Sequence, residues 1–291
     1  MKVLLTGATG LLGGALVRLM VREGHEVRCL LRPESPNASR LDRLVEVAHG
    51  DAGDAGSLSE ALRGMDAMLH TAGIEYAAQV TEALRSAGVE RLVAVSSTSA
   101  HSSYPARSGP KLDAETVVRG SGLSWTVVRP AMIYGSELDK NLHRLLRFLD
   151  RSPVFPVFGS GENLWQPVYY EDLARGTLEA LTRPEAVGET YDLPGAEPLT
   201  YAELVRTAAA ALGRSPRLLR VPLEPVRRAL RLAEAVRIPL PVASEQVLRL
   251  REDKAYPHEK ACRELGYEPR PFEEGIVLEV ARLRELGMVR S

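Results

Sequence analysis

Three glycines near the start of the chain have the spacing of a phosphate-binding turn. They stand at Gly7, Gly10 and Gly13, after the apolar residues 3–5 and before an amphipathic stretch. In such a turn the first glycine permits a sharp bend, the second a close approach of backbone to phosphate, and the third close packing of helix on strand. The helix N-terminus offers free N–H groups and the positive end of a dipole. The pattern favours dinucleotide binding, and a tight strand-to-helix turn without a ligand is the alternative.

A second position bears on which dinucleotide binds. A site that prefers NAD usually has an acidic residue at the end of the second strand, roughly 20 residues after the glycines, where it binds the ribose 2′-hydroxyl. Here Leu31 holds that place, Arg32 follows, and the next carboxylate is that of Glu34. A guanidinium can hold a 2′-phosphate through charge-assisted, bidentate hydrogen bonds. We therefore expect NADP(H) to be preferred and NAD(H) to be the alternative; an Arg32 that is merely solvated would select neither.

Strands and helices alternate along the first 130 residues, and these elements must position the glycines. Apolar strands are predicted at Lys2–Thr6, Glu26–Leu31, Val45–His49, Ala67–His70, Arg91–Ser96 and Ser124–Arg129. Helices are predicted at Leu11–Glu23, Ser57–Arg63, Ala77–Ala87 and Lys111–Arg119. Strands that are apolar almost throughout indicate a parallel sheet covered on both faces. We therefore expect an α/β fold with a doubly wound Rossmann sheet of six or seven parallel strands, whose ligand lies beyond the strands' carboxyl ends.

The pattern changes after Pro130. A helix is expected at 138–151, a loop rich in Pro, Gly and aromatic residues at 152–167, a short strand at 168–170 and a helix at 171–182. Further helices are expected near 200–212, 224–235, 242–251 and 258–265. These elements predict a dinucleotide-binding domain over 1–130, to which 168–182 returns. The remainder, 131–167 and 183–291, is expected to form a smaller, mostly helical C-terminal domain on the substrate side.

Composition limits the classes of partner. The 291 residues are 45% hydrophobic and carry a formal net charge of −1, which argues against a nucleic-acid binder. No apolar run approaches the ~20 residues of a membrane span. The chain begins directly with a strand, so a signal peptide is not expected and a cytoplasmic location is. No spacing typical of a metal site is present, and the expected partner is a small-molecule substrate or an unknown protein, bound by a monomer or homodimer.

Several motifs together resemble one family. They are Thr6–Gly13, Gly50–Asp51, Ala72–Gly73, Val95–Ser97, Arg129–Pro130 with Ile133–Gly135, Pro167–Asp172, and the tail Glu264–Pro269 with Glu274–Ile276. The chain is similar to the short-chain dehydrogenase/reductase superfamily, in its extended and atypical branches. Those branches include nucleotide-sugar epimerases and dehydratases, the NmrA-like proteins and an accessory NAD(P)H-binding subunit of respiratory complex I. The resemblance covers nearly the whole chain and does not by itself specify a reaction.

The resemblance implies a cofactor site, which is transferred here residue by residue. The matching positions are Gly7, Thr9, Gly10, Leu11 and Leu12 for the pyrophosphate, with Gly13 closing the turn; Asp51 and Ala52 for the adenine; Thr71, Ala72 and Gly73 beyond the fourth strand; and Pro130 and Ile133 beside the nicotinamide. Alternatives remain open at two of these places. The alternative for Asp51 is a turn residue, and the alternative for Ala72–Gly73 is an ordinary loop after a strand.

The catalytic positions that the resemblance implies are incomplete. Members that transfer hydride generally use a Tyr-x-x-x-Lys pair on one helix face and a preceding Ser or Thr that holds the substrate oxygen. Thr98 matches the Ser/Thr place and Lys111 the lysine, which also matches a ligand of the cofactor, but Arg107 stands where the tyrosine is expected. Tyr104 lies seven residues before Lys111. Because Pro110 favours a helix start near its own position, Tyr104 is expected in a loop.

Three functions follow from this resemblance. The first is an NADP(H)-dependent oxidoreductase acting on a small carbonyl or hydroxyl substrate with Thr98, Lys111 and either Tyr104 or His101. The second is a non-catalytic protein that senses NADP(H) or assists assembly, like the NmrA-like proteins or the complex I subunit. The third is a nucleotide-sugar epimerase or dehydratase. The arginine at position 107 favours the second function and weakens the third.

Overall fold

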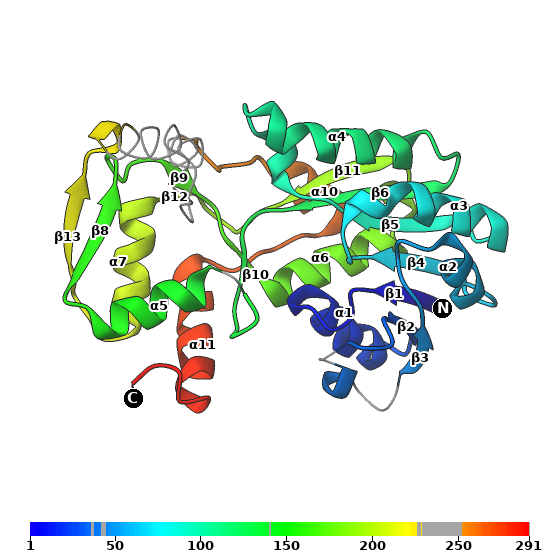
Figure 1. Ribbon diagram of the computed structural model, residues 1–291, viewed down its shortest axis with the longest axis horizontal. Coiled ribbons are helices and arrows are strands. Elements are labelled where there is room, and N and C mark those ends of the chain that lie inside the picture. The colour runs from blue at the N-terminus through cyan, green and yellow to red at the C-terminus, as the bar shows by residue number, and fades with distance from the viewer. Residues whose placement is uncertain (36–37, 42–44, 140, 226–227, 229–251, 291) are drawn as a thin grey trace. The chain divides into compact units, whose positions relative to one another are not determined.

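The computed structural model describes residues 1–35, 38–41, 45–139, 141–225, 228 and 252–290 (Figure 1). The helices expected near 224–235 and 242–251 fall almost entirely outside these residues. The chain forms two compact units. The first comprises residues 1–133, 168–194 and 256–269, and the second comprises 134–167, 195–255 and 270–291.

Seven parallel strands form the sheet of the first unit, in the order β11-β6-β5-β4-β1-β2-β3 (Figure 1). Their bounds are β1 Lys2–Thr6, β2 Glu26–Leu31, β3 Glu46–His49, β4 Ala67–His70, β5 Arg91–Val95, β6 Ser124–Pro130 and β11 Glu189–Leu193. The predicted doubly wound parallel sheet is therefore confirmed. Strand β11, which pairs along β6 at the edge of the sheet, was not predicted from the sequence.

Helices cover both faces of this sheet, and alternate residues of β1 point to opposite faces. Leu5 packs with residues of α1, α6 and α10, whereas Leu4 packs with residues of α2, α3 and α4. The bounds of these helices are α1 Leu11–Arg22, α2 Ala55–Ala61, α3 Ala77–Ala87, α4 Pro105–Arg119, α6 Tyr170–Thr182 and α10 Glu259–Leu265. Short 3-10 helices are η1 Ala38–Arg40, η2 Ile74–Tyr76, η3 Thr98–His101 and η4 Pro184–Ala186.

The first unit includes two segments that the sequence analysis assigned to the second domain. Residues 183–194 belong to it because β11 adds an edge strand beside β6. Residues 256–269 belong to it because Ala261 and Leu265 of α10 are buried in the same core as α1 and α6. Both additions depend on pairing and packing partners that are distant in the sequence.

Helix α4 begins five residues earlier than predicted, so the expected start near Pro110 was wrong. Pro105 is the first residue of the helix and Tyr104 is its N-cap, while Pro110 lies inside the helix. A proline in this place removes the hydrogen bond to the carbonyl four residues earlier, that of Ala106. Ala106 and Pro110 are both exposed. Water can therefore satisfy this carbonyl, which makes the interruption tolerable.

The described residues of the second unit include helices α5 Leu142–Arg151, α7 Tyr201–Ala211 and α11 Phe272–Glu285 and two small pairs of strands. The strands are β8 Val154–Phe158, which pairs in parallel with β13 Arg217–Val221, and β9 Leu164–Trp165, which pairs antiparallel with β12 Leu199–Thr200. Two further short strands among the described residues are β7 Ile133–Tyr134 and β10 Val168–Tyr169. Among the described residues no helix has the length and hydropathy needed to cross a bilayer.

Candidate active site

The glycine turn is closed so tightly that side chains would not fit at two of its positions. Gly7 has φ of +74°, and a Cβ atom placed there would lie 2.6 Å from Oγ1 of Thr71. A Cβ atom at Gly13 would lie 2.1 Å from the carbonyl oxygen of Gly7. Backbone atoms are therefore in direct contact where the end of β1 meets the start of α1 and the loop after β4. This is the arrangement that the sequence pattern predicted at the carboxyl end of β1.

The N-terminus of α1 has no side-chain capping hydrogen bond. Gly10 is its exposed N-cap and donates its amide to the Gly7 carbonyl at 3.0 Å; no side chain caps the first turn, and that turn contains no acidic residue. Thr9 and Leu11 are half-buried and Leu12 is buried beside it. Uncapped amides and the helix dipole favour an anion at this place. The pyrophosphate of a dinucleotide fits this turn, since a Cβ atom placed at Gly10 would have only the Gly7 carbonyl oxygen, at 3.3 Å, within 4 Å.

The loop after β4 is fixed to β1 by hydrogen bonds. The Thr71 hydroxyl donates to the Thr6 carbonyl at 2.7 Å, and the Thr71 amide donates to the Thr6 hydroxyl oxygen at 3.2 Å. Ala72 is exposed, and Gly73 has φ of +137°, a conformation that strongly favours glycine. The three residues predicted beyond the fourth strand thus lie in one loop beside Gly7.

His70 holds this loop in place, and the sequence analysis missed it. Its Nε2 lies 2.7 Å from the Gly73 carbonyl oxygen and its Nδ1 2.8 Å from the Thr6 hydroxyl. Because a carbonyl only accepts, Nε2 carries the proton and Nδ1 accepts from Thr6. Complete burial lowers the pKa of His70, so the ring is neutral at pH 7. The available signal was a polar residue that ends an otherwise apolar predicted strand.

The residues predicted for the adenosine end lie after β2 and β3. Arg32 directly follows β2, and its exposed guanidinium forms no ion pair with any described residue. The Gly50 amide donates to the Leu31 carbonyl at 2.9 Å, which joins the two strand ends. The exposed Asp51 carboxylate accepts from the Gly53 amide at 2.8 Å, and Ala52 is buried. Asp51 therefore shapes its own turn, and no described carboxylate pairs with Arg32.

Helix α4 places Tyr104 and Lys111 differently from the usual catalytic pair. Tyr104 is half-buried and has extended backbone angles at the N-cap, so it precedes the helix as expected, although the helix itself starts earlier than predicted. Seven residues are close to two helical turns, which puts Tyr104 and Lys111 on one face but about one turn further apart than a Tyr-x-x-x-Lys pair. Arg107 is exposed in the first turn. Lys111 is half-buried, and its Nζ lies 3.4 Å from Oε2 of Glu75, which belongs to η2.

Thr98 and Pro130 are brought into contact. The buried Thr98 hydroxyl donates to the Pro130 carbonyl at 3.2 Å, which is longer than a typical O–H···O bond. Ile133 is half-buried three residues further on. Helix α4 packs against both η3, which contains Thr98, and η2, which follows Gly73. The predicted catalytic and nicotinamide-side residues therefore surround the carboxyl ends of β4, β5 and β6.

A buried ion-pair network connects α4 with the ends of β5 and β6. It was not predicted from the sequence. Glu115 is fully buried; its carboxylate accepts from Arg129 at 2.8 and 2.6 Å, from Arg119 at 2.9 Å and from Ser96 at 2.7 Å. Burial alone would raise the pKa of Glu115, but the hydrogen bonds from Arg129 and Ser96 hold it below its ordinary value. The network fixes α4 to the ends of β5 and β6. It thereby positions the helix that contains Lys111.

His101 belongs to a second polar contact near Thr98. Its Nε2 lies 2.9 and 3.0 Å from the two carboxylate oxygens of Asp192 in β11, and its ring packs on Tyr256 with ring centroids 5.5 Å apart. Residues three apart in a 3-10 helix project in the same direction, so Thr98 and His101 share one side of η3. The described residues contain no group of His, Cys, Asp and Glu side chains placed to hold a metal ion.

Comparison with known proteins agrees with this geometry. A family model described as NAD(P)H-binding matches residues 7–147, which include the glycine turn, Thr71–Gly73, Thr98 and Lys111. A ceramide reductase of Caulobacter vibrioides is 33% identical over 240 residues, which are 76% of this chain and 73% of that protein. This chain belongs to the short-chain dehydrogenase/reductase superfamily. Within the superfamily it has the NAD(P)-binding domain of the atypical and extended members.

Other relatives of this short-chain dehydrogenase/reductase differ in their named roles. An NAD(P)H azoreductase of Xenophilus azovorans is 26% identical over 78% of this chain and 80% of its own length. Subunit 9 of the mitochondrial NADH dehydrogenase 1 alpha subcomplex of Arabidopsis thaliana is 26% identical over 84% of this chain and 66% of its own length. The solved structure of PA4631, a nucleoside-diphosphate-sugar epimerase from Pseudomonas aeruginosa, shares the fold, with a TM-score of 0.80 at 23% identity over 100% of this chain and 99% of that one.

Proposed function

We propose that this chain is an NADP(H)-dependent oxidoreductase that acts on a small carbonyl or hydroxyl compound. The observation that carries the proposal is the glycine turn, in which Gly7 and Gly13 admit no side chain and the start of α1 is left uncapped. Two relatives named as reductases support a redox role. The cytoplasmic location and the monomer or homodimer expected from the sequence are part of this proposal.

Each predicted cofactor residue has a role in this proposal. Gly7 to Gly13, with Thr9, Leu11 and Leu12, hold the pyrophosphate; Asp51 and Ala52 border the adenine; and Arg32 binds the 2′-phosphate. Thr71, Ala72 and Gly73 line the ribose and nicotinamide, which Pro130 and Ile133 cover. Lys111 binds the nicotinamide ribose. These roles rest on the positions of the residues at the strand ends and on the family to which the chain belongs.

The chemistry assigned to this site needs one proton donor. When bound, the reduced cofactor supplies a hydride to the carbonyl carbon of the substrate. Thr98 orients the substrate oxygen, because its long bond to the Pro130 carbonyl can be exchanged for one to the substrate. Tyr104 donates the proton from the N-terminus of α4. Arg107 cannot do so, since its guanidinium is never deprotonated in a protein.

Arg32→Ala should reverse the preference between the two dinucleotides. Loss of charge-assisted hydrogen bonds to the 2′-phosphate is expected to weaken NADP binding about 10-fold to 100-fold and to leave NAD binding unchanged. Calorimetric titration of both dinucleotides into both proteins measures this. Arg22→Ala, which removes an exposed guanidinium at the end of α1, is the control and should change neither affinity. Tighter binding of NAD than of NADP by the wild type would contradict the assignment of Arg32.

Lys111→Ala should weaken cofactor binding more than Tyr104→Phe does. The ammonium contributes a charged hydrogen bond of about 1.5–3 kcal/mol, whereas the Tyr104 phenol acts only in turnover.

Turnover of generic carbonyls and nucleotide sugars should be slow or absent, because a displaced proton donor typically costs ~10²–10⁴-fold in rate. Dinucleotide titration and absorbance of the reduced nicotinamide report the two effects, with exposed Arg107→Ala as the control on α4. Fast NADPH oxidation that Tyr104→Phe abolishes would show that Tyr104 is an efficient catalyst.

One observation favours a second function, a non-catalytic protein that binds NADP(H). Arg107 stands where the usual tyrosine is expected. A relative that matches 84% of this chain is named as a subunit of mitochondrial NADH dehydrogenase. Such a protein would bind the dinucleotide tightly and oxidise none of it. A panel of small carbonyl compounds tested with NADPH separates the two functions, because any saturable turnover that depends on Thr98 excludes the second.

A further inference from the structure

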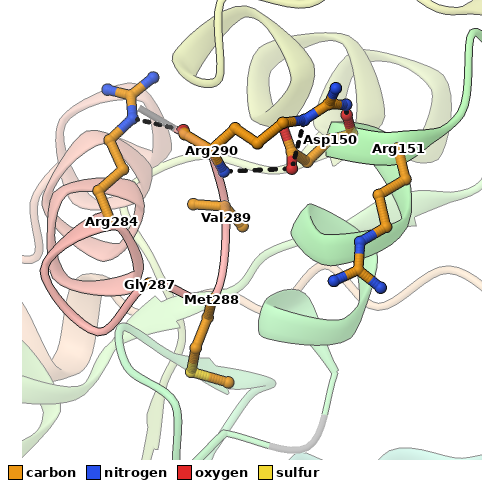
Figure 2. Close-up of a pocket in the computed structure, with 7 residues that line it drawn as sticks. All are labelled: Asp150, Arg151, Arg284, Gly287, Met288, Val289 and Arg290. Carbon is orange, nitrogen blue, oxygen red and sulfur yellow. Dashed lines mark hydrogen bonds and ion pairs between the residues drawn. The ribbon is translucent and has the colours of Figure 1, made fainter.

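An open cavity of about 760 Å³ lies in the second unit, between the end of α5 and the C-terminal end of α11 (Figure 2). Its lining residues are Asp150, Arg151, Arg284, Gly287, Met288, Val289 and Arg290. Its volume is within the range of small-molecule sites, about 300–1,000 Å³. None of its residues belongs to the glycine turn or to the catalytic positions assigned above.

The single carboxylate of this cavity is already neutralised. Asp150 is 4% exposed, accepts from Arg214 at 3.1 Å, and accepts at 3.2 Å from both the backbone amide and Nε of Arg290. Burial alone would raise the pKa of Asp150, but these hydrogen bonds from Arg290 and Arg214 hold it below its ordinary value. The carboxylate is therefore ionised at pH 7, and two guanidinium groups share its charge.

Two further arginines line the cavity and have no carboxylate partner among the described residues. Arg284 donates from Nε to the carbonyl of Arg290 at 3.3 Å and from Nη2 to the carbonyl of Leu212 at 3.5 Å, and neither carbonyl carries a charge. Arg151 is exposed and forms no ion pair with any described residue. Figure 2 shows the side chains of Arg284 and Arg151 on opposite sides of the opening, with Arg290 beside Asp150 and Met288 below them. The lining therefore has an excess of positive charge that no described side chain offsets.

We propose that this cavity binds a phosphate group. Guanidinium groups match the oxygens of phosphate with pairs of parallel hydrogen bonds, and the excess positive charge of the lining favours an anion. Arg284 is held in place by its two carbonyl acceptors, so little side-chain freedom is lost on binding. The ligand is a soluble phosphate or the phosphate headgroup of a lipid, since both present the same oxygens to the arginines.

The test uses the methionine methyl groups of the full chain as local reporters. Protein labelled with ¹³C at its methionine methyls is saturated with NADP, so that the glycine turn is occupied, and is then titrated with inorganic phosphate and with pyrophosphate. The Met288 methyl should shift with saturation, while Met68, which is fully buried in the first unit, should not. If NADP does not bind, the same titration of the free protein still reports on the cavity, so failure of the proposed function is seen separately.

Two variants decide whether the arginines are responsible. Arg284→Ala should weaken phosphate binding at Met288 about tenfold or more, because it removes a charged hydrogen-bond donor. Arg147→Ala removes an exposed arginine of α5 that does not line the cavity and should leave the affinity unchanged. Circular dichroism and thermal melting establish that both variants are folded.

A vesicle experiment distinguishes the two sources of phosphate. Sedimentation with phosphatidylcholine vesicles that contain phosphatidic acid, but not with phosphatidylcholine alone, would identify a lipid headgroup, provided that Arg284→Ala reduces it. Saturable binding of phosphate or pyrophosphate without sedimentation would identify a soluble ligand. The proposal is overturned if none of these probes shifts Met288, or if Arg284→Ala and Arg147→Ala bind phosphate equally.

Discussion

Gly13→Ala is expected to abolish dinucleotide binding. The new methyl group would lie 2.1 Å from the Gly7 carbonyl oxygen and 2.8 Å from the Cα of Ala8, so α1 must move away from the turn. The helix amides would then no longer meet the pyrophosphate. Each hydrogen bond to a charged group contributes about 1.5–3 kcal/mol, and loss of two corresponds to roughly 100-fold weaker binding or more. Calorimetric titration with NADPH measures the change.

The adjacent glycine is a matched control. A Cβ atom at Gly14 would meet only ordinary contacts, at 3.5 Å from the Ala8 carbonyl oxygen and 3.6 Å from Arg18. Gly14→Ala should keep dinucleotide affinity and gain up to about 1 kcal/mol of helix stability. Should Gly13→Ala fail to fold, Gly10→Ala tests the same turn, because its methyl group projects at an exposed N-cap. Equal NADPH affinities of Gly13→Ala and Gly14→Ala would contradict the assignment of the turn.

Glu279→Gln is expected to stabilise the protein, increasingly so as the pH rises. Glu279 is fully buried in α11, and burial, with the negative charge of Asp139, raises its pKa to about 10. The unfolded chain ionises at its ordinary pKa near 4.5. Between these values the folded protein keeps a proton that the unfolded chain releases, so stability falls as the pH rises. At pH 7 the cost is on the order of 3 kcal/mol.

Denaturant unfolding at pH 4, 7 and 9 measures this effect. The free energies of unfolding of wild type and Glu279→Gln should be nearly equal at pH 4 and should diverge above it, since glutamine has no proton to lose. Glu273→Gln, an exposed position in the first turn of the same helix, is the control and should give a small, nearly constant difference. A difference between Glu279→Gln and wild type that is independent of pH would show that Glu279 is ionised in the folded protein.

Local patterns accounted for the sheet and for the glycine turn. Continuous apolar runs predicted six strands of the sheet with errors of about one residue at their ends, because buried parallel strands admit few polar side chains. The turn was predictable because Gly7 and Gly13 are required by backbone contacts within one strand–helix unit. Strand β11 escaped because Glu189, Thr190 and Asp192 interrupt its apolar pattern, and an edge strand needs no continuous apolar run.

The start of α4 shows the limit of local reasoning. Pro110 suggested a helix start, but Pro105 is equally suitable at the first position, and the choice depends on which turn faces solvent. The buried Ser108, whose hydroxyl donates to the Tyr104 carbonyl at 3.3 Å, lies in the turn that the prediction omitted. That burial is a tertiary property, so the position of Tyr104 relative to Lys111 was not available from spacing.

The sequence by itself determined the superfamily, the parallel sheet and the place of the dinucleotide turn. These depend on hydrophobic period and on glycine geometry, which act over fewer than about 30 residues. The tertiary structure alone decided that His70 holds Gly73, that Glu115 fixes α4 through Arg129, and that Glu279 is buried near the negative charge of Asp139. Each of these depends on burial and on partners from distant segments, and the charge of a side chain does not reveal whether the fold will surround it with water, with a counter-charge or with neither.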